Sequence, residues 1–354
     1  MNLRFLLIII FLLTFTTLVQ SANEPVKATG EKIWGDNKKD ITFIEGNVQI
    51  IQGSTRIFTE KAKVDTEKKV AVFEEKVKLN HPDVTIEADS LEYNFKKKVG
   101  TFSKNIILDR AEVKDELGKV TKDAFQLTAT ELYFESDTKN FTAKKDGSVS
   151  HKDFTGTADI IEYNDKNQEL LFKGHAYLKR PNEEKINGEE IKINTQTKSF
   201  IVNKEIKLVN DDVTINGSRL DYDYQQKKGV FQDNVILERA ESKDEHGKIT
   251  KEYFKLTTTE LFFDSDTKNF STKTKGTVEH KDFTGSADRI EYNNDREELV
   301  FNKNAHLTRP KGEEINGDLI TIMIHDKSFI VTENVNINFN VEAEKEERKT
   351  GRKR

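Results

Sequence analysis

A short pattern of side chains recurs nine times along this chain of 354 residues, and it constrains the fold more than any other feature. In each copy, four apolar or small positions are separated by steps of two, three and two residues, as at Ile86, Ala88, Leu91 and Tyr93. The second of the four positions is always occupied by a small residue. Its nine occurrences are residues 59, 88, 129, 158, 188, 217, 258, 287 and 317.

Each step of two predicts a β-strand, because alternate side chains of a strand face opposite sides. A step of three in a flat strand would turn the following apolar side chains toward solvent. We therefore predict that each of these strands bends at the step, so that both halves face inward and the small residue fits the corner. An acidic residue such as Asp89 or Asp159 often follows the small one and is expected to face water.

Each unit also contains a second predicted strand, which opens with an aromatic residue and then alternates, as at Phe102, Ile106 and Leu108. Two strands every 29 to 30 residues predict a stack of rungs in which each unit contacts mainly its neighbours. The predicted fold class is therefore all-β, an elongated stack of bent strands. At about 4.8 Å per strand, nine units span roughly 85 Å if each strand crosses both layers, and about half that if it serves one layer.

A long block of this sequence is duplicated in tandem. Segment 151–156 recurs at 280–285, an offset of 129, and the same register holds without a gap from about residue 72 to residue 340. The two copies are predicted at about 72–200 and 201–340.

Two of the spacings between small positions are 41 residues rather than 29 or 30. The additional residues are the charged segments 112–122 and 241–251, each of which contains a glycine. We predict that each segment is a charged hairpin tip or loop that projects from one flank of the stack.

The first 21 residues have the layout of a secretory signal peptide, predicted to be helical. An apolar run follows a short basic start, and small residues precede Ala22, the expected first residue after cleavage. An uncleaved membrane anchor is the alternative, although about 15 to 17 apolar residues are few for a full span. Residues 22–40 are expected to be a linker, and the charged residues 341–354 a disordered tail.

The composition excludes several kinds of site. The chain has no cysteine, so disulfides, thiolate metal sites, a cysteine nucleophile and a lipidated cysteine anchor are all excluded. The net charge of −5 gives no reason to expect a nucleic-acid partner. Hydrophobic residues make up only 35% of the chain and charged residues 34%, which is little apolar material for a compact globule of this size. The repeat favours a long, thin core over partial disorder.

The polar residues form no recognisable catalytic motif: His-Glu-x-x-His, Gly-x-Ser-x-Gly and the phosphate-binding glycine loop are all missing from the sequence. His151 and His280 recur between the copies, and a surface turn is expected at each rather than a metal or acid–base site. The acidic segments 221–223 and 264–266 lack the spacing of a calcium loop and are expected to be solvated. The lysines at 96–98 are expected to form a solvated turn. The sequence therefore predicts no catalytic residue, no metal site, no cofactor and no enzymatic activity.

Two stretches of the sequence carry a family resemblance. Phe43–Gly53 and the recurring unit Ile86–Tyr93 resemble the OstA-type domain, which occurs in LptA, LptC and the periplasmic part of LptD. The resemblance covers roughly residues 41–340. It implies a slightly twisted, open β-jellyroll whose apolar interior is a groove for the acyl chains of lipopolysaccharide (LPS). The chain departs from the family in having nearly twice the rungs expected of the usual bridge protein.

The resemblance also implies a function and partners. It implies an LPS-binding and transport protein in the periplasm of a diderm bacterium, which bridges the inner and outer membranes and holds LPS or lipid A acyl chains. Other OstA-type jellyrolls of the membrane transport complexes, or further copies of this chain, would stack on the strand edges at either end. The apolar stripe expected to line the groove consists of Ile57, Ile86, Leu91, Leu127, Leu132, Ile161, Ile186, Ile191, Ile215, Leu220, Leu256, Leu261, Ile290, Ile315 and Ile320.

Other interpretations of the same residues stay open. The inward stripe could pack against itself and form the closed, dry core of a secreted β-solenoid scaffold or adhesin, which would take up no lipid. Retention of residues 1–21 would instead make the chain a membrane-anchored component similar to LptC. A lipid groove is attractive energetically, because each methylene removed from water contributes roughly 0.8 kcal/mol.

Overall fold

The computed structural model describes residues 24–36 and 39–339 of the chain. The predicted signal helix, the cleavage site before Ala22 and the predicted tail at 341–354 lie outside these residues. The described chain is built from β-strands, which confirms the all-β fold class. None of its segments is a helix long and apolar enough to cross a membrane.

Most strands belong to one antiparallel sheet in which strands adjacent in the sequence are also adjacent in space. The strands of the first half are β1 (Lys27–Thr29), β2 (Lys32–Asp36), β3 (Ile41–Gln52), β4 (Thr55–Asp65), β5 (Val70–His81), β6 (Val84–Asn94), β7 (Val99–Arg110), β8 (Val113–Lys114), β9 (Val120–Lys122), β10 (Phe125–Glu135), β11 (Phe141–His151), β12 (Phe154–Asn164), β13 (Glu169–Lys179) and β14 (Lys185–Asn194). The strands of the second half are β15 (Ser199–Asn210), β16 (Val213–Asp223), β17 (Lys228–Arg239), β18 (Ser242–Lys243), β19 (Ile249–Lys251), β20 (Phe254–Asp264), β21 (Phe270–Thr272), β22 (Gly276–His280), β23 (Phe283–Ala287), β24 (Arg289–Asn293), β25 (Glu298–Thr308), β26 (Glu314–Met323), β27 (Ser328–Thr332) and β28 (Asn336–Asn338).

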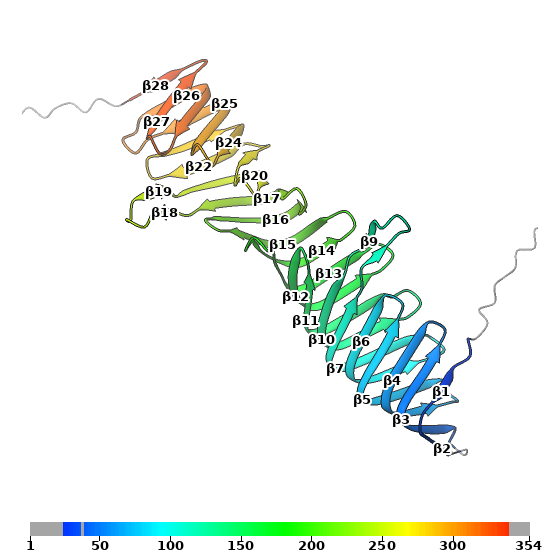
Figure 1. The fold of residues 1–354 in the computed structure, drawn as a ribbon. Coiled ribbons are helices and arrows are strands. Elements are labelled where there is room, and N and C mark those ends of the chain that lie inside the picture. The colour runs from blue at the N-terminus through cyan, green and yellow to red at the C-terminus, as the bar shows by residue number, and fades with distance from the viewer. Residues whose placement is uncertain (1–23, 37–38, 340–354) are drawn as a thin grey trace, which may run out of the picture.

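The sheet is a long stack of rungs that runs from the N-terminal end to the C-terminal end of the molecule (Figure 1). Its 24 strands occupy 20 positions, because β1 and β2, β21 and β22, β23 and β24, and β27 and β28 each share one position. Each long strand contributes to both layers of the stack, as the longer of the two length estimates assumes. At about 4.8 Å per rung the stack spans roughly 90 Å.

Each long strand has an irregularity at its centre, where the sequence predicts a bend. In β6 the side chains of Ile86, Ala88, Leu91 and Tyr93 are all buried, although a step of three separates the second from the third. The pairing of β5 with β6 shifts register at this step, where two residues of β5 lie opposite one of β6. Both halves of the strand therefore face the interior, as predicted, and the exposed Asp89 lies at the outer side of the bend.

The neighbouring strand accommodates the bend through its backbone. Glu75 and Lys76 of β5 have φ angles of +66° and +59°, in the left-handed region. The same pair of left-handed residues recurs near the centre of β7, at Lys104 and Asn105. Polar side chains at these positions reach solvent, and a bulge of this kind increases local twist and bends the strand. Each strand thus folds over the interior, and one continuous apolar core runs between the two layers.

Within the region expected to be a linker, residues 22–40, the described residues 27–29 and 32–36 belong to the sheet instead. Both β1 and β2 pair with β3, and the Trp34 ring stacks on Phe43 with 5.5 Å between ring centroids. The linker prediction was wrong there because these strands are short and largely exposed, so they lack the buried alternation on which the prediction of strands relied.

The two insertions at 112–122 and 241–251 form hairpins, as predicted. The first contains β8 and β9, and the second contains β18 and β19. Each hairpin is separate from the main sheet and extends from the same row of turns in its own copy of the duplicated block.

Candidate functional site

The apolar stripe predicted from the sequence lies inside the stack. All fifteen of its residues are at most 1% exposed and belong to the continuous core between the two layers. They are contributed by the strands that carry the step of three, so they line the whole interior rather than one pocket. Their burial shows that these side chains face the interior. Their contact with a lipid stays a prediction.

Two rows of turns run along the stack on the side opposite the bends. The first turn row contains the turns that follow β3, β5, β11, β13, β15, β22 and β25, and the second contains those that follow β4, β6, β10, β12, β14, β16, β20, β24 and β26. Side chains of one row bond to the other row, as when the Gln52 amide donates to the Phe95 carbonyl at 2.9 Å and the Asn210 amide to the Ser265 carbonyl at 2.8 Å. We call the line where the two rows meet the seam.

A buried arginine closes the seam in the first copy. Arg110, 2% exposed, lies at the end of β7 and pairs with two carboxylates, Asp83 of the first turn row and Asp165 of the second. Its guanidinium also donates to the Tyr163 hydroxyl at 2.8 Å. Two lysines complete the group: Lys139 pairs with Asp83, and Lys122 with Asp165.

The second copy repeats this arrangement around Arg239, which is 1% exposed. Arg239 lies 3.4 Å from Asp212 and 3.0 Å from Glu297, measured between nitrogen and oxygen. Asp212 occupies the place of Asp83 and bonds to Lys268 at 2.7 Å, but the second carboxylate comes from a different position. Asn294 stands where the first copy has Asp165, and Glu297 where it has a glutamine. The arginine therefore keeps a carboxylate partner in both copies, although a residue at a different position supplies the carboxylate.

A third buried arginine lies between these two. Arg180 donates to Glu184 at 2.8 Å, to the Tyr222 hydroxyl at 2.7 Å and to the Tyr224 carbonyl at 2.8 Å. The Glu184 side chain is fully buried. Because Glu184 follows β13 and Tyr222 lies near the end of β16, this cluster also joins the two turn rows.

Asp123 forms a smaller ion-pair cluster across the seam. It pairs with Lys152 at 2.7 Å and with Lys198 of the second turn row. Burial opposes ionisation of Asp123, but hydrogen bonds from the two lysines outweigh it and hold the pKa of Asp123 below its usual range. Burial likewise acts to raise the pKa of Asp165, and hydrogen bonds from Lys122 and Arg110 hold it low.

The turns at His151 and His280 were predicted correctly, but their imidazoles are buried rather than exposed. The ring of His280 stacks on Phe283, with 4.9 Å between centroids. The residue two positions later donates its backbone N–H to Nδ1 of each ring. A phenylalanine directly after a tight turn covers the imidazole, which the local sequence does not reveal.

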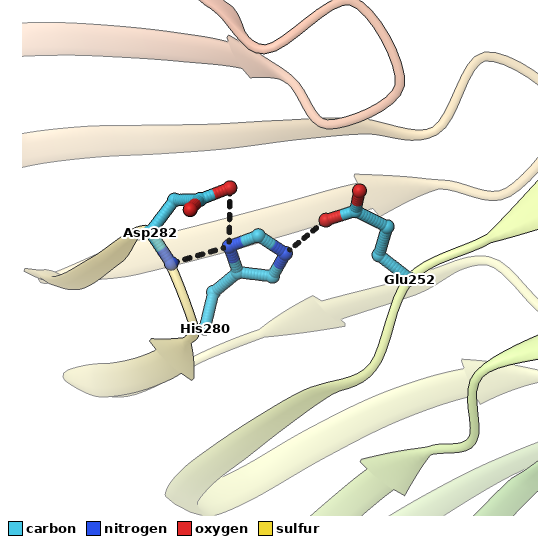
Figure 2. Close-up of side chains that lie close together, drawn as sticks. All are labelled: Glu252, His280 and Asp282. Atoms are coloured by element: carbon cyan, nitrogen blue, oxygen red, sulfur yellow. Dashed lines mark hydrogen bonds and ion pairs between the residues drawn. The ribbon is translucent and has the colours of Figure 1, made fainter. Parts of the chain in front are cut away.

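Glu252, His280 and Asp282 come together in the second copy (Figure 2). Nε2 of His280 lies 2.8 Å from Glu252, whereas Nδ1 faces Asp282 at 4.0 Å. The two carboxylates thus approach opposite nitrogens of one ring, so each forms its own contact with the imidazole. Lys281 also pairs with Glu252 at 3.1 Å. The group has the chemistry of an ion-paired turn rather than of a metal centre.

The stability of the seam is expected to fall in mildly acidic solution. Burial lowers the pKa of His81, His151 and His280 below the ordinary value of 6.5. Below about pH 6.5 the unfolded chain binds protons that the folded chain does not, so the free energy of unfolding falls as the pH decreases through that window. We expect the urea midpoint to fall between pH 7 and pH 5. The double variant His151→Gln/His280→Gln should show a flatter pH profile, and an unchanged midpoint in the parent chain would contradict the prediction.

The seam opens into a hollow at the C-terminal end. Arg309 and Glu313 occupy the places of Arg180 and Glu184, but their side chains are 42% and 32% exposed. Here the hollow has a volume of about 470 Å³ and lies against Phe283 and Phe329. Beside Arg180, Tyr222 and Tyr224 pack on the equivalent phenylalanines, Phe154 and Phe200.

Sequence reasoning missed the seam residues. Arg110 recurs as Arg239 and Arg180 as Arg309, each at an offset of 129, and each lies at or just after the end of a strand. That recurrence of a charge at strand ends was the available signal. The acidic segments 221–223 and 264–266 are partly or fully exposed at their carboxylates, and Lys96 and Lys97 are exposed in their turn.

Comparison with known proteins gives a family and a related fold. The sequence matches the family described as LptA/(LptD N-terminal domain) LPS transport protein over residues 27–199 and 214–328, more than half of the chain. One similar solved structure is that of LptH, the LptA homologous periplasmic component of the conserved lipopolysaccharide transport device from Pseudomonas aeruginosa. The similarity covers 43% of this chain and 84% of that chain, at 13% identity and a TM-score of 0.22. No curated protein matches the chain.

Proposed function

Because this chain belongs to the LptA/LptD N-terminal domain family of LPS transport proteins, we propose that it binds LPS in the periplasm and bridges the inner and outer membranes. The family is one of transport proteins, and its chemistry is binding and release rather than catalysis. One observation carries the proposal: the apolar core that contains the stripe continues from β3 to β26 as a single cluster. Acyl chains would lie against that stripe.

The energetics of the interior favour lipid over water. Each methylene that leaves water contributes roughly 0.8 kcal/mol, so a partly buried acyl chain gains several kcal/mol. Because the same apolar surface repeats in every rung, one position along the stack resembles the next. A lipid can therefore move along it without crossing a large difference in binding free energy.

The C-terminal edge of the stack supports docking of another jellyroll. Val335 is 50% exposed and Ile337 is 45% exposed, whereas the equivalent residues 129 positions earlier, Ile206 and Leu208, are 2% and 0% exposed. The next rung, β16, covers Ile206 and Leu208. A further strand added by a partner, either another OstA-type protein or a second copy of this chain, would cover the exposed pair in the same way.

Photo-crosslinking from the interior tests LPS binding without introducing a charge. Phe262 and Phe263 are adjacent on β20 and face opposite sides, at 39% and 0% exposed. We expect p-benzoylphenylalanine at position 263 to crosslink LPS in cells, because the benzophenone would contact acyl chains. The same probe at position 262 should give little or no adduct.

The matched pair also separates the alternatives. Equal adducts at both positions would indicate nonspecific adsorption to the surface. Failure of position 263 to crosslink, in a chain that accumulates and folds as the parent does, would favour the closed scaffold with a dry core.

A further inference from the structure

Arginines recur at a regular interval along the seam. Arg110, Arg180, Arg239 and Arg309 lie at or directly after the ends of β7, β13, β17 and β25. Four rungs separate each from the next, a distance of about 19 Å at 4.8 Å per rung. We call these four residues the arginine ladder.

Arg110, Arg180 and Arg239 lie between the apolar interior and the seam, whereas Arg309 lines the open hollow. The guanidinium of Arg110 is 5.3 Å from the centroid of the Tyr163 ring, and Arg180 is 5.3 Å from the Tyr222 ring. Arg239 is 5.2 Å from the equivalent tyrosine, Tyr292. The aromatic ring therefore lies beside the guanidinium in both copies, while carboxylates of the turn rows pair with its nitrogens.

Each of the three buried arginines has a nitrogen donor without a hydrogen-bond acceptor among the described residues. Nε of Arg110, Nε of Arg180 and Nη1 of Arg239 are buried and have no hydrogen-bond partner among the described residues. A buried donor without an acceptor costs free energy, so an additional acceptor at this place would be favourable. Around Arg110, three cationic side chains, Arg110, Lys122 and Lys139, face two carboxylates. The local charge therefore favours a further anion.

If the acyl chains of a lipid lie inside the stack, the fold restricts where its polar head group can lie. The strands remain hydrogen-bonded to their neighbours on both sides of the bend, so the bent side of the stack is closed. The seam is joined by side chains rather than by backbone pairing. A head group can therefore lie only at the seam or at an end, and along the seam it would meet the arginine ladder.

We propose that the arginine ladder binds the phosphate of an acylated lipid head group, which displaces the seam carboxylate at each step. A phosphate accepts paired hydrogen bonds from a guanidinium as a carboxylate does, so the exchange conserves the geometry of the pair. The change from Asp165 in the first copy to Glu297 in the second fits this role, because the arginine is kept while its displaceable partner varies. The proposal rests on the proposed function.

The variant Asp165→Asn/Glu297→Gln tests this exchange. Each substitution installs the residue that the other copy already carries at the equivalent position. We expect the dissociation constant for 1-palmitoyl lysophosphatidic acid, below its micellar concentration, to fall about tenfold, because one competing charge-assisted hydrogen bond is removed. The dissociation constant for 1-monopalmitoyl glycerol, which lacks the phosphate, should stay within about twofold of the parent value.

Two control variants of the full chain accompany it. Glu87→Gln/Glu189→Gln makes the same change of charge at exposed ion pairs and should leave both dissociation constants at the parent values. Asp165→Asn/Gln168→Glu moves the carboxylate of the first copy to the place it has in the second, and it should retain the parent affinity for lysophosphatidic acid.

The possible outcomes bear on different claims. Equal changes for the two lipids, or no change for either, would overturn the role of the ladder and leave the proposed function standing. Binding of neither lipid to the parent chain would overturn both. A competition experiment with inorganic phosphate completes the test. If inorganic phosphate displaces lysophosphatidic acid when the two are present at equal concentrations, the site binds free phosphate, and the lipid head group is overturned as its ligand.

Discussion

Replacing Arg180 by methionine lowers the free energy of unfolding by about 3–5 kcal/mol, whereas the same change at Arg309 lowers it by about 0–1 kcal/mol. Both arginines pair with a glutamate four residues later, at 2.8 and 2.9 Å. The difference is burial: the side chains of Arg180 and Glu184 are 7% and 0% exposed, those of Arg309 and Glu313 are 42% and 32%. Loss of Arg180 leaves a carboxylate buried without its cation, and loss of Arg309 leaves one in water.

Urea unfolding of each variant, followed by circular dichroism, provides the measurement. The double variant Arg180→Met/Glu184→Met should recover much of the loss, because an apolar pair of similar volume avoids the unpaired charge. Equal destabilisation by Arg180→Met and Arg309→Met would contradict the assignment of the seam as a buried ionic layer at Arg180 and an open one at Arg309.

Placing an aspartate at Leu261 should reduce the LPS that co-purifies with the chain by about tenfold or more, because about 1.4 kcal/mol of lost affinity already suffices for tenfold. Leu261 is fully buried in the apolar stripe, and an ionised carboxylate there is desolvated whenever an acyl chain lies against it. In a stacked repeat the damage to folding is expected to remain near the substituted rung.

Phe262→Asp is the matched control, since Phe262 adjoins Leu261 on β20 but is 39% exposed. That variant should keep the parent amount of LPS. LPS is quantified per mole of purified chain, after circular dichroism has confirmed the strand content of both variants. Equal retention of LPS by the Leu261 and Phe262 variants would place the lipid outside the stack, and no LPS on the parent chain would favour the closed scaffold.

The two predictions concern different requirements of one molecule. Under the proposed function, an apolar interior would accept the acyl chains, and the seam would open for a head group to pass. In the structure the seam is joined by ion pairs of Arg110, Arg180 and Arg239, which hold the two layers together. Such pairs can exchange one anion for another, whereas an apolar seam could not.

Much of the fold follows from local sequence. Periodicity at Ile86, Ala88, Leu91 and Tyr93 predicted a strand with a bend, because each side chain's direction in a strand depends only on its position along the chain. The same reasoning predicted that all fifteen stripe residues face inward, and it predicted the two inserted hairpins. It failed at β1 and β2, where short exposed strands carry no alternation.

The repeat in the sequence by itself determined the all-β class, the bends and the inward stripe, because these depend on periodicities within one or two strands. Only the tertiary structure decided what happens at the seam. Arg110 and Asp165 are separated by 55 residues, and Asp123 and Lys198 by 75. Folding each strand over the core brings both ends of every rung to one side, so charges that are distant in the sequence become buried partners. No local sequence pattern predicts these long-range pairs. The folding of the strands also places the arginines at the seam, where a lipid head group would have to pass.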